Sequence, residues 1–176
     1  AGGEPQIRMV SSALTLTGTP YRTYFEGAQF VHFLLGPATV ALAIPLFTQL
    51  ARLKRMLLPL LGALLVGSLT ACVSAVAIGW ALGASNESIR SLAPKSVTTP
   101  IAMGVAEKIG GLPSLTAVLV VSTGILGAVA ARYLLDALRI RDHAVRGFAV
   151  GVSAHGIGTA RAFQVSEEAG AFAALA

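Results

Sequence analysis

The sequence predicts an all-α integral membrane protein, a multi-span helical bundle in which some helices are discontinuous or re-entrant. Only 12% of its 176 residues are charged, whereas soluble domains average about 25%. Residues 27–51, 56–86 and 109–131 hold no charged side chain when histidine is neutral, and each stretch exceeds the ~20 residues that a spanning helix needs. Nineteen glycines and eight prolines are typical of membrane helices that contain breaks.

The basic residues indicate how the chain is oriented. A net charge of +5 by itself suggests nucleic-acid binding, but most Lys and Arg side chains lie at the ends of the apolar stretches, as the positive-inside rule describes. Residues 52–55 hold three of them and residues 132–146 hold four. We therefore predict that both clusters face the cytoplasm, that the lipid bilayer surrounds the spans, and that no nucleic acid is bound.

The first two spans are predicted at residues 29–50 and 57–83. Gly36, Pro37 and Pro45 interrupt the first, so it is either a kinked helix or a helix with a functional break that lines a cavity. The second has a small residue at every fourth position, which lets helix backbones approach closely. We expect this face to pack against another helix or another subunit, so a homo-oligomer is one prediction. The small residues are Ala63, Gly67, Ala71, Ala75, Gly79 and Gly83.

A broken or re-entrant segment is predicted at residues 93–111. Proline disfavours helix before it, so residues 93–99 should be non-helical. Thr99 is expected as the N-cap and Pro100 as the first residue of a short helix, which two glycines end. Because both basic clusters face the cytoplasm, residues 84–113 should begin and end outside. We therefore predict that the segment dips into the membrane and returns, and an additional crossing followed by a return is the alternative.

The third span is predicted at residues 112–138, and a polar, glycine-rich broken segment follows at residues 149–162. Residues 166–176 begin another apolar stretch. Its last eight residues would cover about 12 Å as a helix, which is less than half of the hydrocarbon thickness. We therefore expect a single membrane domain over residues 1–176 that stops inside its last span.

Two polar stretches offer partners for a small organic anion. In the first, Lys95 can pair with a carboxylate beside the positively charged start of the short helix. In the second, Arg161 can bind a carboxylate bidentately. Hydroxyl groups would bind the rest of the anion, and glycines would let backbone N–H groups turn toward it. The candidate substrate-binding residues are Lys95, Ser96, Thr98, Thr99, Pro100, Ser153, His155, Gly156, Gly158, Thr159 and Arg161.

Each of these residues also has a simpler structural role. Lys95 can extend to the outer interface, Arg161 can be one more cytoplasmic charge, and hydroxyls can satisfy carbonyls at helix breaks. His155 can be a hydrogen-bonded packing residue or a contact for a proton or substrate. Ionisable groups inside a membrane are costly and usually functional, which favours substrate contact for the pair of stretches. The apolar stretches hold no carboxylate, metal-ligand cluster or nucleophile–base spacing, so we predict no enzyme, cofactor or metal site.

Three strings carry a family resemblance: residues 35–46 (LGPATVALAIPL), 94–103 (PKSVTTPIAM) and 153–161 (SAHGIGTAR). They resemble the LrgB/CidB family of bacterial membrane proteins, and the plastid glycolate/glycerate translocator carries a similar region. The resemblance covers about residues 16–176. It implies a multi-pass protein of the bacterial inner (plasma) membrane, distantly similar to transporters built from inverted repeats with broken helices.

The resemblance implies two competing functions. Members are described as transporters of small monocarboxylates such as glycolate, glycerate or pyruvate, which would work by alternating access. Bacterial members are also described as modulators of murein hydrolase export and autolysis that act with a small holin-like membrane partner of the LrgA/CidA type. A holin-like pore would need a polar helix face, whereas residues 57–83 offer small packing residues, so the sequence favours transport.

Overall fold

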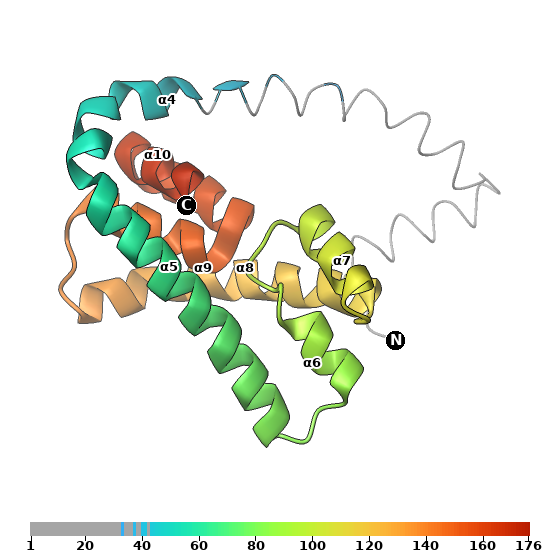
Figure 1. The fold of residues 1–176 in the computed structure, drawn as a ribbon. Helices are drawn as coiled ribbons and strands as arrows, with labels where there is room; N and C mark the ends of the chain where they lie inside the picture. Colours follow the sequence, from blue (N-terminus) through green and yellow to red (C-terminus); the bar gives the residue numbers. More distant parts are fainter. Residues whose placement is uncertain (1–32, 34–36, 38–39, 42) are drawn as a thin grey trace, which may run out of the picture. The chain divides into compact units, whose positions relative to one another are not determined.

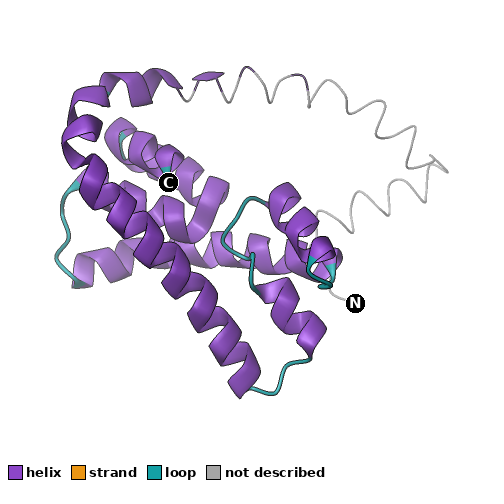
Figure 2. Cartoon of the chain, viewed as in Figure 1, coloured by secondary structure: helices purple, strands orange, loops and turns teal. Residues whose placement is uncertain are grey.

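The computed structural model describes residues 33, 37, 40, 41 and 43–176. In this part of the chain every regular element is an α-helix, which confirms the all-α prediction there (Figures 1 and 2). The predicted first span lies largely outside the described residues. The helices are α4 (Ala43–Thr48), α5 (Leu50–Ala81), α6 (Asn86–Leu92), α7 (Thr99–Lys108), α8 (Pro113–Ala137), α9 (His143–Val165) and α10 (Glu167–Leu175).

Two of these helices, α5 and α8, are long and apolar enough to cross a membrane. They have 32 and 25 residues, so as straight helices they would be about 48 and 38 Å long. Large apolar side chains such as Leu58, Leu65 and Leu126 are exposed on them. Such exposure suits contact with lipid chains and agrees with a membrane protein.

The small-residue face of α5 packs against other helices of the same chain. A methyl group added at Gly79 would lie 3.3 Å from Leu92 Cδ2 of α6, and one added at Gly67 would lie 3.2 Å from Val152 Cγ1 of α9. The face therefore brings two neighbours close to one span, as small residues allow. It is shorter than the sequence predicts, because Gly83 lies in the turn after the helix with a φ of 73°.

The start of α7 differs from the prediction by one residue. The first intrahelical bond runs from Ala102 N to Thr98 O (2.9 Å), so the N-cap is Thr98. The prediction of Thr99 as the N-cap is wrong, and Pro100 takes the second helical position. This shift is possible because the first N–H groups of a helix have no intrahelical partner, so a proline fits either position.

The chain leaves α6 and comes back beside it. Leu112 N donates to Ser91 Oγ (2.7 Å), and Thr116 Oγ1 donates to Ser91 O (3.1 Å). Between these contacts α7, with ten residues, extends about 15 Å, which is half of the hydrocarbon core. The segment between α6 and α8 therefore leaves α6 and returns beside it, and its entry into the membrane stays a prediction.

Helix α9 is broken at His155, where φ is 42° and ψ is −140°. A continuous helix of 23 residues would hold its ends about 33 Å apart. Instead, Arg52 of α5 binds both Asp142, which precedes α9, and Glu168, which follows it. Helix α9 therefore folds back on itself after a first arm, residues 143–154.

Helix α10 packs against both arms of α9. In the first arm, a methyl group added at Gly147 would overlap the carbonyl oxygen of Ala169, so the absence of a side chain lets the two backbones meet. In the second arm, residues 156–165, Thr159 Oγ1 donates to Ala173 O (3.1 Å). The two arms and α10 thus form a bundle of short helices, which contacts α8.

Ionic contacts hold the starts of α5, α9 and α10 together. Arg52 Nη2 lies 2.6 Å from Asp142 Oδ2, and Arg52 Nη1 pairs with Glu168. Asp142 is also the N-cap of α9 and accepts from Val145 N (3.1 Å). This backbone bond and the Arg52 charge hold the pKa of Asp142 below its ordinary value. The start of α5 and the α8–α9 link therefore lie at the same end, as the charge pattern predicts.

Replacing Gly147 by alanine should destabilise the α9–α10 contact, because the new methyl group has no room beside Ala169 O. Overpacking of this kind costs ~1–3 kcal/mol, more than the ~1 kcal/mol that alanine gains in helix propensity. The melting temperature of the purified protein in detergent should therefore fall. Gly104→Ala in α7 is the control, since a methyl group there meets no described atom within 4 Å. Equal melting temperatures for the two variants would contradict the close contact.

Candidate functional site

The break in α9 lies near the middle of both candidate spans. A methyl group added at Gly124 of α8 would lie 2.9 Å from the His155 ring, so this glycine provides the room that the ring occupies. Val152, three residues before the break, packs in the same way on Gly67 of α5. Gly124 is the twelfth of 25 residues in α8, and Gly67 is the eighteenth of 32 in α5. Transporters with discontinuous helices bind their substrates at such breaks.

Local hydrogen bonds hold the strained backbone of His155. A φ of 42° favours glycine, and strain of this kind costs roughly 1–3 kcal/mol in other residues. The ring Nε2 lies 3.0 Å from Val120 O of α8. The Thr159 hydroxyl shares its one hydrogen between Ala173 O and the His155 carbonyl (3.0 Å). The bond from Thr159 satisfies the carbonyl at the break, and the bond to Val120 gives the imidazole a partner on α8. The ring of His155 therefore ties the break to α8.

Open space borders one side of the break. A methyl group at Gly156 would meet no described atom within 4 Å, whereas Gly158 and Thr159 are buried. Ser153 is exposed, and its hydroxyl donates to Ala149 O (2.8 Å). Of the predicted residues in this stretch, Ser153 and Gly156 border accessible space, and Gly158 and Thr159 pack inside.

The end of α6, which precedes the first polar stretch, is attached one helical turn away along α8. Thr116 binds the end of α6 at Ser91, and Val120, four residues later, binds His155. Both of these α8 residues are fully buried. Positions four apart share one face of a helix and lie about 6 Å apart along it. One face of α8, which we call the receiving face (Thr116, Val120 and Gly124), therefore contacts both the end of α6 and the break of α9.

Lys95 and its neighbouring hydroxyls lie in the turn before α7 and at its start. Lys95 is half-buried, and its Nζ donates to Ser96 Oγ (3.2 Å). Thr98 is exposed, and within the described residues its side chain makes no capping hydrogen bond. Thr99 and Pro100 occupy the first turn of α7, where N–H groups carry a partial positive charge. This stretch therefore offers a cation, hydroxyls and a helix start to an anion.

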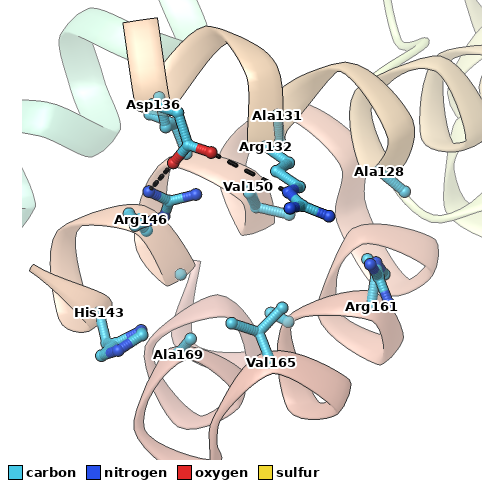
Figure 3. Close-up of a pocket in the computed structure, with 13 residues that line it drawn as sticks. Ala128, Ala131, Arg132, Asp136, His143, Arg146, Val150, Arg161, Val165 and Ala169 are labelled. Atoms are coloured by element: carbon cyan, nitrogen blue, oxygen red, sulfur yellow. Dashed lines mark hydrogen bonds and ion pairs between the residues drawn. The ribbon is translucent and has the colours of Figure 1, made fainter. Parts of the chain in front are cut away.

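Arg161 lies elsewhere, in a cavity of about 290 Å³ (Figure 3). The cavity is bordered by α8, both arms of α9 and α10. Among the residues that the structure describes, none between 95 and 100 lines it. The structure thus places the two predicted charged partners, Lys95 and Arg161, in different surroundings.

Four further charged or titratable residues line the same cavity as Arg161: Arg132, Asp136, His143 and Arg146. Arg146 Nη1 lies 2.6 Å from Asp136 Oδ1 and donates to Ile140 O (3.0 Å). Sequence reasoning missed these residues as site candidates, because along the chain they only mark the basic end of a span. The signal available was a histidine and an arginine, His143 and Arg146, shortly before the broken segment. Only the fold-back of α9 brings them to Arg161.

Comparison with known proteins places the chain in a family. The LrgB-like family model matches residues 6–176. This chain belongs to the LrgB-like family. The resemblance that the three strings indicate is therefore confirmed.

Curated relatives of this LrgB-like protein span most of the chain. Uncharacterized protein YwbG of Bacillus subtilis (strain 168) is 41% identical over 162 residues, which are 92% of this chain and 72% of that protein. YxaC of the same strain is 36% identical over 90% of this chain and 69% of its own length. Antiholin-like protein LrgB of Bacillus mycoides (strain KBAB4) is 31% identical over 89% of this chain and 68% of its own length. No solved structure matches the chain.

The strings that indicate the LrgB-like family fall at the interruptions of the fold. The string at residues 94–103 forms the turn before α7 and the first half of that helix. The string at residues 153–161 contains the break of α9. The string at residues 35–46 lies mostly outside the described residues. The two described strings therefore coincide with the turn before α7 and with the break of α9.

Proposed function

We propose that this LrgB-like protein is an antiholin-like, multi-pass component of the bacterial inner membrane. In this role it modulates murein hydrolase export and autolysis together with a small holin-like membrane partner of the LrgA/CidA type. The observation that carries the proposal is the name of its relatives. LrgB proteins of Bacillus mycoides and Bacillus cereus, which are 31% and 30% identical over 89% of this chain, are called antiholin-like.

The packing of α5 supports a regulatory role rather than a pore. A helix that lines an aqueous lesion needs a polar face along its length. On α5, Gly67 and Gly79 face α9 and α6, while large side chains such as Leu65 and Ile78 are exposed and apolar. A surface of this kind suits lipid or the apolar helix of a membrane partner.

Co-expression tests the antiholin-like role. Cells that produce the holin-like partner together with this protein should release less murein hydrolase and lyse more slowly than cells that produce the partner alone, because an antiholin opposes a holin. Lys95→Gln, which alters the polar turn but not the packed contacts of α5, should delay lysis as strongly as the unchanged protein. If cells that produce the partner lyse at the same rate with and without this protein, the antiholin-like role is contradicted.

A second candidate function is transport of small monocarboxylates of the glycolate, glycerate or pyruvate class. The break at His155 favours it, because alternating-access transporters bind substrates where helices are interrupted near the middle of the membrane. Lys95 would pair with the carboxylate, and the open backbone at Gly156 would face the substrate. Hydrogen bonds to the hydroxyl or keto oxygen would come from Ser96, Thr98 and Thr99.

Uptake into liposomes tests the transport candidate. Lys95→Gln should raise the apparent KM for radiolabelled glycolate or pyruvate about 10- to 150-fold, because a charge-assisted hydrogen bond is worth ~1.5–3 kcal/mol. Thr99→Val should weaken uptake less, since it removes one neutral hydrogen bond of ~1 kcal/mol. Lys54→Gln, at the exposed start of α5, is the control and should leave uptake unchanged. Normal uptake by Lys95→Gln with loss in Lys54→Gln would rule out the proposed site.

A further inference from the structure

The cavity at the basic end of α8 carries an excess of positive charge. Its charged lining consists of Arg132, Arg146 and Arg161 with one acidic residue, Asp136. Three guanidinium groups against one carboxylate leave a net charge of +2 when His143, which also lines the cavity, is neutral. An excess of this kind in a concave site attracts an anion.

The arginines keep donors available for a ligand. Arg146 uses Nη1 on Asp136 and Ile140 O, and Arg161 uses Nη1 on Gln164 Oε1 (2.8 Å). Arg132 has a side chain that is 73% exposed and reaches Asp136 only at 4.0 Å. Each guanidinium has five N–H donors, so most of them remain unused by these contacts. Figure 3 shows Arg146 and Arg161 on opposite sides of the cavity with Arg132 between them.

We propose that this cavity binds the phosphate group of a phosphate ester, either a free monoester or the headgroup of an anionic phospholipid. A carboxylate is planar, and one arginine can satisfy it bidentately. A phosphate presents oxygens in tetrahedral directions and can accept from several arginines at once. The three guanidinium groups come from α8 and from both arms of α9, an arrangement that suits a phosphate.

The remaining lining indicates an ester rather than a bare inorganic ion. Leu135, Val150 and Val165 form apolar walls that suit a glycerol or acyl portion. Arg132 is the twentieth of 25 residues in α8, so the cavity lies at the last turns of a candidate span, where lipid headgroups are found. Basic pockets between spans at this level bind anionic headgroups.

Binding at this site would stabilise the fold-back of α9. In a continuous helix Arg146 and Arg161 would lie about 22 Å apart along the axis, whereas here both line one cavity. A phosphate held by both residues would therefore connect the first arm to the second. The inference does not depend on which of the two proposed functions is correct.

Binding to the purified protein with two probes tests the site. Titration with glycerol 3-phosphate in neutral detergent measures a Kd for the free ester. The melting temperature of the protein is also compared between nanodiscs of phosphatidylcholine alone and nanodiscs that contain phosphatidylglycerol. A higher value with phosphatidylglycerol reports stabilisation by the anionic lipid. Arg132→Gln and Arg161→Gln should each raise the Kd for glycerol 3-phosphate about tenfold or more, as expected for the loss of a charge-assisted hydrogen bond. Each should also reduce the rise in melting temperature that phosphatidylglycerol causes. Arg141→Gln is the matched control, because Arg141 is exposed near the same end but does not line the cavity.

The outcomes separate the two sources of phosphate. Saturable binding of glycerol 3-phosphate that depends on Arg132 supports a free ester. Stabilisation by phosphatidylglycerol alone, again dependent on Arg132, supports the lipid headgroup. The proposal is overturned if neither probe has an effect, if Arg141→Gln reduces the response as much as Arg132→Gln, or if glycolate binds in the cavity as tightly as glycerol 3-phosphate. None of these measurements uses lysis or uptake, so failure here is distinguishable from failure of the proposed functions.

Discussion

The receiving face of α8 is the feature on which the rest of the structure depends. Inside a membrane, polar backbone groups must be satisfied by protein or water, so an interrupted helix needs a protein surface beside it. Thr116 binds the carbonyl at the end of α6, Val120 O binds the His155 ring, and Gly124 leaves room for that ring. One face of a candidate span therefore supports the end of α6 and the break of α9. A bulky residue at Gly124 would displace the ring and leave the break without its partner.

The fold-back of α9 divides the chemistry of the protein into two regions. Near the middle of the spans lie hydroxyl groups, His155 and open backbone at Gly156, which offer hydrogen bonds. At the end of α8 lie three arginines around one cavity, which offer charge. Because of this separation, Arg161 lines the cavity at the end of α8 and does not join the groups around His155, although it lies only six residues from the break. Under the proposed functions, the first region would meet a passing solute and the second would hold an anion.

Local features of the sequence predict much of this fold, and long-range contacts decide the rest. The apolar length of α5 and α8, the prolines around Lys95 and the glycines around His155 are readable along the chain, and they predict the spans and both interruptions. The direction in which α9 continues after its break is not readable. It depends on Gly147 meeting Ala169 and on Arg52 binding residues at both ends of α9. For the same reason the cavity of Arg132, Arg146 and Arg161 could not be predicted, because its members become neighbours only through that reversal.

The fold-back of α9 is tested most directly by an EPR distance between spin labels at residues 143 and 165, in a Cys72→Ala background with the full chain in lipid. Packed helices lie about 8–10 Å apart between their axes, so we expect a distance below about 20 Å with the label arms included. A continuous helix would hold the labels about 33 Å apart. A distribution centred near that longer distance would contradict the fold-back, and with it the cavity that joins Arg146 to Arg161.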